Sequence, residues 1–230
     1  MIGTLVNSAS IIAGGIIGLL LTRGIPQGMK SVIIQALALS VVLIGITKAI
    51  TTNEILLVIL SLVIGGALGE SLRIEARLEA LGRRLECLVG SKGGRVAEAF
   101  VSTSLIYCVG AMAIVGSIED GLLGQPHTLF AKSILDGISA IIFSATMGVG
   151  VIFSAAAVLL YQGSISLLSS YVRPILTDTV ITELNAVGGL LIFAIGLDLL
   201  EIKKLKVGNM LPSLLVIVVL VLVSSYVRSG

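Results

Sequence analysis

The residue best placed to do chemistry in this sequence is Asp136, a carboxylate inside the apolar stretch "KSILDGISAIIFSATMGVGVIFSA" at 132–155. An ionised carboxylate in hydrocarbon costs about 2.5 to 3.5 kcal/mol even on the lenient insertion scale, so such a group usually faces water, a partner or a pathway. Lys132 lies four residues earlier, on the same helical face, where an ion pair is available. Two interpretations stay open: an interfacial ion pair, or a polar path in which Asp136 binds a cation or a proton.

Amides near the starts of other apolar runs could share that path. Buried amides need hydrogen-bond partners, so one interpretation is that they fix helix packing and the other is that they orient a small polar solute. Small and hydroxylated residues follow Asp136 along its own run, and hydroxyls can hydrogen-bond across helix interfaces. The candidate substrate or ion path is Asp136, Asn7, Gln35, Asn185, Ser139 and Ser154.

No pattern in the sequence predicts an enzyme, a metal centre or a cofactor. His127 is the only histidine, and it stands beside Pro126 without a nucleophile and base arrangement around it. Cys87 and Cys108 show no metal-ligand spacing, and a Walker-type nucleotide-binding loop is absent. We therefore expect no catalytic residues, no bound metal and no cofactor.

The composition places the chain in a lipid bilayer. Hydrophobic residues make up 56% and charged residues 12% of it, and the mean hydropathy is +1.13. Soluble proteins carry roughly 25% charged residues, and a soluble fold of this size could not hide so much apolar surface. The net charge of +2 is small and the basic residues form no single stripe, which excludes nucleic acid as a partner.

Repeated apolar runs predict a single all-α polytopic membrane domain over 1–230. A helix needs about 20 apolar residues to cross the hydrocarbon layer, and the sequence contains about seven apolar runs close to that length. The predicted crossings lie near 3–22, 31–50, 54–70, 97–117, 133–161, 183–201 and 209–227.

The run at 133–161 is long enough to leave its own topology open. About 29 residues rise roughly 43 Å as a helix, which is more than one hydrocarbon thickness of about 30 Å but less than two. Gly148 and Gly150 lie where a helix break would fall. Discontinuous helices with free backbone groups are a feature of substrate sites in transporters.

A weak internal similarity predicts two three-helix repeats, at 1–70 and 133–227, separated by a linking helix at 97–117. "SASIIAGGII" at 8–17 is similar to "SATMGVGVIF" at 144–153, and 35–50 is similar in pattern to 185–200. One crossing at 133–161 makes the repeats parallel, whereas two crossings make them inverted. In either case we expect the polar site where the repeats meet.

The segment 71–92 differs from the rest because charged residues fill one face of its helical pattern and leucines the other, which predicts an amphipathic surface helix on the cytoplasmic side. The excess of Lys and Arg in cytoplasmic loops favours a multi-pass protein of the prokaryotic plasma (inner) membrane, with the N-terminus outside and the C-terminus inside. The lysine cluster "EIKKLK" at 201–206 disagrees with that orientation.

Two GxxxG spacings, Gly14 with Gly18 and Gly65 with Gly69, permit close helix crossing or association of two copies into a homo-oligomer. Glu183 precedes Asn185, and we expect its carboxylate at the membrane interface instead of in the core.

Several stretches resemble one bacterial inner-membrane family, DUF 554 (YqgA type). They are "GTLVN" at 3–7, "CVGAMAIVGSIEDGLLG" at 108–124, "KSILDGISAIIFSATMGVGVIFSA" at 132–155, "YQGSI" at 161–165 and "AVGGLLIFAIGLDLL" at 186–200. The resemblance implies a polytopic plasma-membrane protein and supplies no functional residues. From the residues themselves we hypothesise a secondary transporter or channel for a small polar solute or ion. The alternative is a non-transporting scaffold, or a binding subunit of a larger importer.

Overall fold

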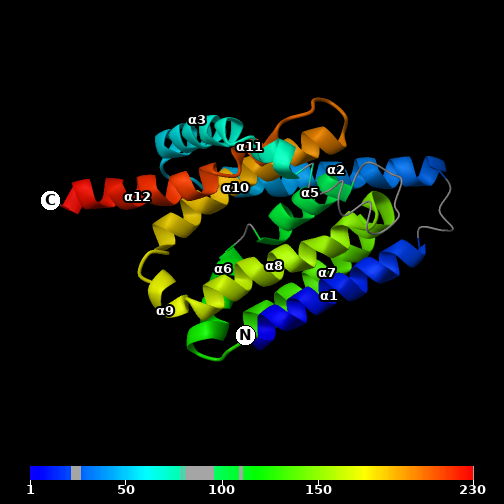
Figure 1. Cartoon of the computed structure of the whole chain (residues 1–230), viewed down its shortest axis with the longest axis horizontal. Helices are drawn as coiled ribbons and strands as arrows, with labels where there is room; N and C mark the ends of the chain where they lie inside the picture. Colours follow the sequence, from blue (N-terminus) through cyan, green and yellow to red (C-terminus); the bar gives the residue numbers. More distant parts are fainter. Residues whose placement is uncertain (22–26, 79, 81–95, 109–110, 230) are drawn as a thin grey trace. The chain divides into compact units, whose positions relative to one another are not determined.

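The computed structural model describes residues 1–21, 27–78, 80, 96–108 and 111–229. Within these residues the regular structure is helical and contains no strand, which confirms the all-α class (Figure 1). The helices are α1 (Ile2–Leu21), α2 (Gln27–Ala49), α3 (Ile55–Ser71), α5 (Val96–Cys108), α6 (Ala111–Leu122), α7 (His127–Met147), α8 (Gly150–Leu167), α9 (Ser169–Val172), α10 (Asp178–Leu199), α11 (Val207–Met210) and α12 (Ser213–Ser229).

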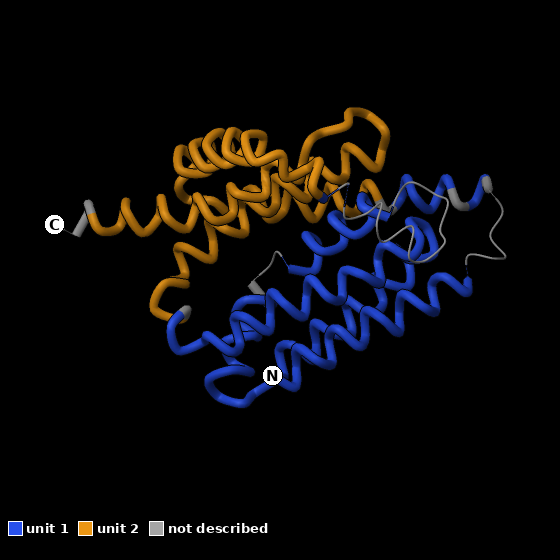
Figure 2. The backbone as a smooth tube through the Cα atoms, viewed as in Figure 1, with its two compact units in different colours: residues 1–37, 78–172 blue, residues 38–77, 173–230 orange. Residues whose placement is uncertain are grey.

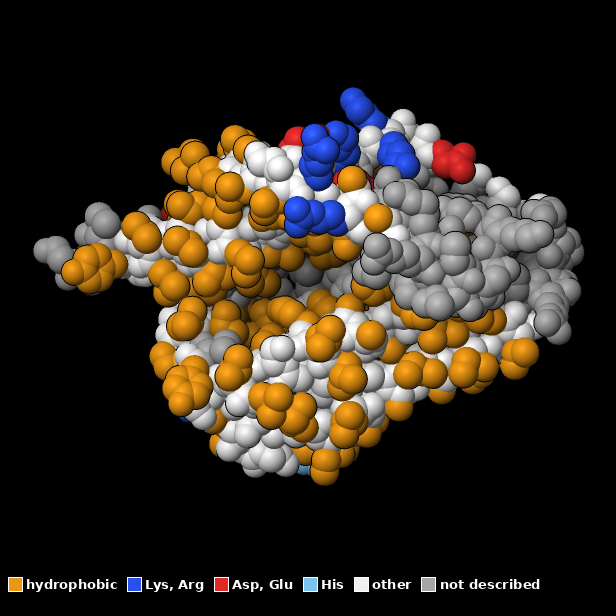
Figure 3. Space-filling model, in the orientation of Figure 1, with side chains coloured by type: hydrophobic (Ala, Val, Ile, Leu, Met, Phe, Trp, Pro, Cys, Tyr) orange, Lys and Arg blue, Asp and Glu red, His pale blue; other side chains and the backbone are white. Residues whose placement is uncertain are grey.

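The long helices have the length and composition of membrane spans. Among the described residues, 6 helices pass as spans, and the number rises to 7 if α5 and α6, which are bent by 64°, count as one. The apolar helix α3 has 17 residues. On the face shown in Figure 3, hydrophobic side chains spread along the helices, whereas Lys and Arg gather near the connection between α10 and α11. The prediction of a polytopic membrane protein with about seven spans is confirmed.

The stretch predicted as one crossing at 133–161 is two helices. α7 ends at Met147, and α8 begins at Gly150. Gly148 between them has φ 87°, a backbone conformation that glycine adopts without steric cost. A Cβ at Gly150 would overlap the carbonyl oxygen of Val96, so the start of α8 packs directly against the backbone of α5. One continuous helix over 133–161 is therefore not formed, and each of the two helices has the length and composition of a membrane span.

The chain folds into two compact units, coloured separately in Figure 2. Unit 1 contains residues 1–37 and 78–172, and unit 2 contains residues 38–77 and 173–230. The predicted repeats, 1–70 and 133–227, do not coincide with these units. Within the repeat prediction, 8–17 is uninterrupted helix whereas its proposed counterpart 144–153 contains the break between α7 and α8.

In unit 1, α1 packs closely along α7 and runs in the same direction. A Cβ at Gly14 would overlap the carbonyl oxygen of Gly137, and a Cβ at Gly18 would overlap that of Ile141. Small residues let helix backbones approach in this way. The first GxxxG pair thus serves a helix crossing within the chain, and association into a homo-oligomer stays a prediction.

In unit 1, α8 and the bent pair α5–α6 run opposite to α1. Gly15 faces Ile152, near the start of α8, whereas Gly163, near its end, lies 3.5 Å by its Cβ position from the side chain of Met1. α8 is therefore antiparallel to α1 and, because α1 and α7 are parallel, to α7 as well. Val96, at the start of α5, contacts Gly150 at the start of α8, and Gly121, near the end of α6, contacts Ser166 near the end of α8. The bent pair α5–α6 therefore runs in the same direction as α8.

Unit 2 contains two antiparallel helix pairs. In the first, Gly45 of α2 packs on the backbone of Phe193 in α10, and Gly196 packs on Val42. In the second, a Cβ at Gly65 of α3 would overlap the backbone at Ser213, where α12 begins. The second GxxxG pair, like the first, serves a crossing within the chain.

Most of the predicted amphipathic helix at 71–92 lies outside the described residues, since residues 79 and 81–95 are not among them. The part that the structure describes continues from α3 through a turn at Arg73, whose φ is 52°.

Candidate functional site

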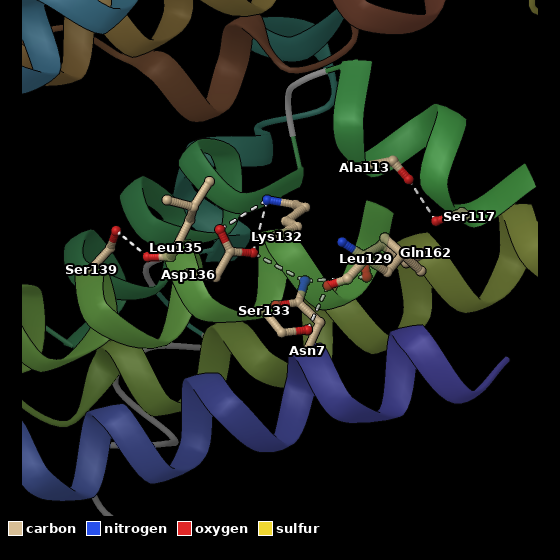
Figure 4. Close-up of polar contacts among 10 residues, drawn as sticks. All are labelled: Asn7, Ala113, Ser117, Leu129, Lys132, Ser133, Leu135, Asp136, Ser139 and Gln162. Atoms are coloured by element: carbon tan, nitrogen blue, oxygen red, sulfur yellow. Dashed lines mark hydrogen bonds and ion pairs between the residues drawn. The ribbon is translucent and has the colours of Figure 1, made fainter. Parts of the chain in front are cut away.

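Buried polar side chains from three helices meet in unit 1 around Asp136. We call Asn7, Lys132, Asp136 and Gln162 the Asp136 cluster (Figure 4). Asn7 comes from α1, Lys132 and Asp136 from α7, and Gln162 from α8. These three helices are far apart in the sequence, and the packing of α7 and α8 on α1 brings the four side chains together.

Lys132 and Asp136 form a buried ion pair. The Lys132 Nζ atom lies 2.9 Å from Asp136 Oδ1 and 2.8 Å from Oδ2. Their relative exposures are 8% and 6%, so little water screens the pair. The i,i+4 spacing aligns them on one helix face. The two charges therefore neutralise each other inside the bundle, and the ion pair that the sequence offered is formed.

Asn7 connects the ion pair to the third helix. Its Nδ2 donates to Asp136 Oδ2 at 3.0 Å and to Gln162 Oε1 at 3.3 Å. Both Asn7 and Gln162 are fully buried, at 0% exposure. One amide group thus joins α1, α7 and α8 through side chains alone. The prediction that Asn7 and Asp136 share a site is met by a direct hydrogen bond between them.

The cluster retains hydrogen-bonding capacity that the protein does not use. Asn7 Oδ1, an acceptor, and Gln162 Nε2, a donor, are buried without a hydrogen-bond partner among the residues that the structure describes. On α1, the hydroxyls of Thr4 and Ser8 lie within one turn of Asn7 and are also buried and unpaired. A buried polar group without a partner costs about 1–3 kcal/mol. Polar atoms in this number and arrangement suit a site that binds water or a polar ligand.

On α5, the Tyr107 hydroxyl and the Ser104 hydroxyl are further buried polar groups without a partner. Tyr107 is 1% exposed and stacks edge-on against Phe143 of α7, with ring centroids 6.5 Å apart. Because α5 packs on both α7 and α8, these hydroxyls extend the polar character of unit 1 beyond the Asp136 cluster.

The Asp136 cluster lies well inside the helices. From His127, the first residue of α7, to Asp136 the helix rises about 14 Å, and from Ile2 to Asn7 in α1 it rises about 8 Å. A hydrocarbon layer is about 30 Å thick. Asp136 and Asn7 therefore lie more than one helical turn inside their helices, and both are buried in the protein.

Other predicted path residues lie elsewhere. Ser139 is half-buried and its hydroxyl donates to the carbonyl of Leu135 at 2.7 Å, while the buried Ser154 hydroxyl donates to the carbonyl of Val151 at 2.6 Å. Hydroxyls in helices often bond to the preceding turn in this way. The structure does not bring either serine into the Asp136 cluster.

The two remaining predicted amides are not in the cluster. Gln35 is exposed on α2, in the part of that helix that belongs to unit 1. Asn185 lies on α10 in unit 2, half-buried, and its Oδ1 is buried without a partner. A cavity shared by Gln35 and Asn185 stays a prediction.

Gln162 is the member of the cluster that sequence reasoning missed. An amide in an apolar helix is a recognisable signal, and "YQGSI" contains one. The predicted crossing at 133–161 ended one residue before it, which placed Gln162 in a connecting segment. The break at Gly148 shifts the span so that Gln162 lies inside α8, which continues to Leu167.

Asp120 of α6 is buried, at 4% exposure, and contacts the N-terminus of α1. Its Oδ2 accepts the backbone N–H of Gly3 at 3.1 Å, and its Oδ1 lies 3.0 Å from the Met1 amino group. Carboxylates are stabilised at helix N-termini, where backbone N–H groups lack helical partners. Asp120 therefore fixes the first turn of α1, the turn that precedes Asn7 of the Asp136 cluster.

In unit 2, Glu183 is fully buried within the protein, and its expected place at the membrane interface stays a prediction. Its Oε2 accepts the Thr52 hydroxyl at 2.5 Å and its Oε1 accepts the Asn53 N–H at 2.9 Å. Carboxylates can be buried when such donors satisfy them. Glu183 fixes the connection between α2 and α3 to α10.

A second polar group in unit 2 joins the end of α3 to α11. Asn209 Nδ2 donates to Glu70 Oε2 at 2.6 Å, and Asn209 Oδ1 accepts the N–H of Glu75 at 2.7 Å. Glu75 Oε2 in turn accepts the N–H of Gly208 at 2.7 Å, and Lys206 bonds to Glu70 at 3.1 Å. These side chains bond to one another and to backbone, which indicates a structural function.

The fold and the buried ion pair define a polytopic helical membrane protein with polar groups held between its helices. The family model described as "Protein of unknown function (DUF554)" matches residues 2–222, and the chain belongs to that family.

Two relatives match over nearly their whole length. The chain is 36% identical over 221 residues to the "Uncharacterized membrane protein YdfK" of Bacillus subtilis (strain 168), which covers 94% of this chain and 93% of that protein. It is 27% identical over 220 residues to the "Uncharacterized protein YqgA" of Escherichia coli (strain K12), covering 94% of each. No solved structure matches the chain.

Proposed function

We propose that this protein is a secondary transporter or channel for a small polar solute, and that the Asp136 cluster is part of its binding site. The observation that carries the proposal is the meeting of α1, α7 and α8 around buried polar atoms, several of which have no partner in the described part of the chain. Ionisable groups inside membrane helices commonly mark substrate or ion pathways. Structural packing alone would be served by apolar residues at lower cost.

The geometry changes the function proposed for Asp136. The Lys132 ammonium already lies at hydrogen-bonding distance from both carboxylate oxygens. A cation at Asp136 would have to displace the Lys132 ammonium or be repelled by it. Asp136 therefore serves as the ion-pair partner of Lys132. The amides of Asn7 and Gln162 then supply the groups that contact a solute.

The helix break at Gly148 also changes the proposed orientation. Six long helices and the bent pair α5–α6 give seven spans, and we add the shorter apolar helix α3 as an eighth crossing in this proposal. With the N-terminus outside, as the loop charges favour, the segment 200–206 lies inside and joins Arg73 and Arg77 there. This arrangement places Lys203, Lys204 and Lys206 on the cytoplasmic side, in agreement with the positive-inside rule. The C-terminus then lies outside the cell, whereas the sequence analysis favoured the inside.

Three antiparallel pairs support an inverted repeat of α1–α2–α3 and α8–α10–α12. Within unit 1, α1 packs on α8, and within unit 2, α2 packs on α10 and α3 packs on α12. In each pair, a helix of the first set contacts its counterpart of the second set. Transporters often carry substrate sites at the interface of inverted repeats, and Asn7 and Gln162 contact each other between α1 and α8.

Flux measurements on purified protein in liposomes test the proposal. We expect wild-type protein to accelerate entry of at least one small polar solute, and the variants Asn7→Leu and Gln162→Leu to reduce that rate by at least tenfold. Ser164→Ala is the matched control, since this exposed hydroxyl on α8 bonds only to the carbonyl of Leu160. Wild-type protein that moves none of a broad panel of ions, amides, amino acids and polyols would end the proposal.

A further inference from the structure

We infer that the solute bound by the Asp136 cluster is small, carries no net charge, and offers both hydrogen-bond donors and acceptors, as a zwitterion or an uncharged amide does. This inference rests on the proposed function and narrows it to one class of substrate. It replaces a cation or a proton at Asp136, which was one of the two interpretations that the sequence left open.

The first argument is charge balance. Lys132 and Asp136 are 8% and 6% exposed and already neutralise each other. Adding a single ion to this pair would leave one uncompensated charge among groups that are screened from water, and such a charge is strongly unfavourable in the interior of a membrane protein. A solute without net charge leaves the balance intact, whether it binds beside the pair or opens it and contacts both partners.

The second argument is the type of hydrogen bond left free. Asn7 Oδ1 can only accept a hydrogen bond and Gln162 Nε2 can only donate, and both are unpaired. Because Asn7 bonds directly to Gln162 at 3.3 Å, these free atoms belong to adjacent groups. A lone cation would satisfy the acceptor only, and a lone anion the donor only. A solute with both kinds of group satisfies the two together.

The third argument is the surrounding hydroxyls. Thr4 lies three residues before Asn7 on the same face of α1 and Ser8 directly follows Asn7. Both have buried hydroxyls that lack a partner among the described residues and can donate or accept. Hydroxyls adapt to either end of a dipolar solute, whereas a site selective for an inorganic cation usually gathers several carboxylate or carbonyl oxygens. The Asp136 cluster contains one carboxylate, and its two oxygens already bond to Lys132.

Uptake of radiolabelled probes into proteoliposomes tests the inference. The probes are glycine as the zwitterion, urea as the uncharged amide, sodium and rubidium ions as cations, and sulfate as the anion. We expect uptake of glycine or urea at least tenfold above protein-free liposomes, with sodium, rubidium and sulfate at the background rate. The solute that moves distinguishes a zwitterion from an amide.

Each outcome separates this inference from the proposed function. Flux of sodium, rubidium or sulfate without flux of glycine or urea would overturn the inference and leave a transporter in place. Background rates for every probe and for the broad panel would overturn both.

The variants Thr4→Val and Ser8→Ala supply a second measurement, because they remove hydroxyls that bond to no protein group and so should not impair folding. We expect them to raise the concentration of glycine or urea that gives half-maximal uptake by at least threefold. Gln125→Leu, a substitution of an exposed amide in the connection before α7, is the control and should leave that concentration unchanged. An unchanged value in Thr4→Val and Ser8→Ala would also contradict the inference.

Discussion

Asn7 and Asp136 are 129 residues apart in the chain, and a 3.0 Å hydrogen bond joins them inside unit 1. Asp136 simultaneously holds Lys132, so one carboxylate connects an amide on α1 with an ammonium group on α7. The glycines that bring α1 against α7 make this contact geometrically available. Helix packing and the polar site are therefore two aspects of the same interface.

The ion pair predicts a characteristic pattern of stabilities. Lys132→Met leaves a buried carboxylate without its cation, and Asp136→Leu leaves a buried ammonium, so each should lower the free energy of unfolding by about 3–5 kcal/mol. The double variant removes both charges and should lie within about 2 kcal/mol of wild type, because an apolar pair needs no desolvation of charge. Unfolding by SDS titration in mixed micelles measures all three.

If the double variant loses the sum of the two single losses, the two charges do not interact energetically as the structure indicates. The double variant also separates folding from function. We expect it to fold and yet to lose solute flux, since the polar site has lost both charged groups.

Two adjacent glycines on α3 give a matched test of helix packing. A Cβ at Gly65 would overlap the backbone at Ser213, whereas a Cβ at Gly66 would meet nothing within 4 Å. We expect Gly65→Ala to destabilise the protein by about 1–3 kcal/mol through overpacking, and Gly66→Ala to be neutral or stabilising by up to about 1 kcal/mol through helix propensity. Thermal unfolding in detergent measures both, and equal effects would refute the close contact between α3 and α12.

The break at Gly148 predicts that α7 and α8 cross the membrane in opposite directions. Single cysteines at Gln125, before α7, and at Val149, between the helices, should then react with a membrane-impermeant thiol reagent from opposite sides. Ser170→Cys, after α8, should react from the same side as Gln125→Cys. The background needs Cys87 and Cys108 replaced by serine or alanine. Reaction of Gln125→Cys and Ser170→Cys from opposite sides would instead contradict two crossings.

The sequence was informative about class and about Asp136 because both depend on local composition. A carboxylate in an apolar run, with a lysine one helical turn before it, predicts an ion pair from periodicity alone, and Lys132 and Asp136 form that pair. The GxxxG spacings likewise indicate close helix approach, which the contacts of Gly14 and Gly65 confirm.

What the sequence could not supply was the partner of each polar group across helices. Gln162 and Asn7 are 155 residues apart, and no local pattern indicates that they bond. Glu183 illustrates the same limit, because its donors at Thr52 and Asn53 come from a connection more than a hundred residues earlier. Residues whose surroundings depend on tertiary packing are the ones that periodicity places poorly.

Glu183 provides the last prediction. Glu183→Ala removes the acceptor of the Asn53 N–H and of the half-buried Thr52 hydroxyl, and a hydrogen bond typically contributes about 0.5–1.5 kcal/mol. We therefore expect a clear loss of thermal stability and faster hydrogen exchange at the Asn53 amide, located in the connection between α2 and α3. Asp178→Ala, an exposed carboxylate in the first turn of the same helix α10, is the control and should leave that exchange rate unchanged. Unaltered exchange at Asn53 in Glu183→Ala would show that this carboxylate does not hold the connection.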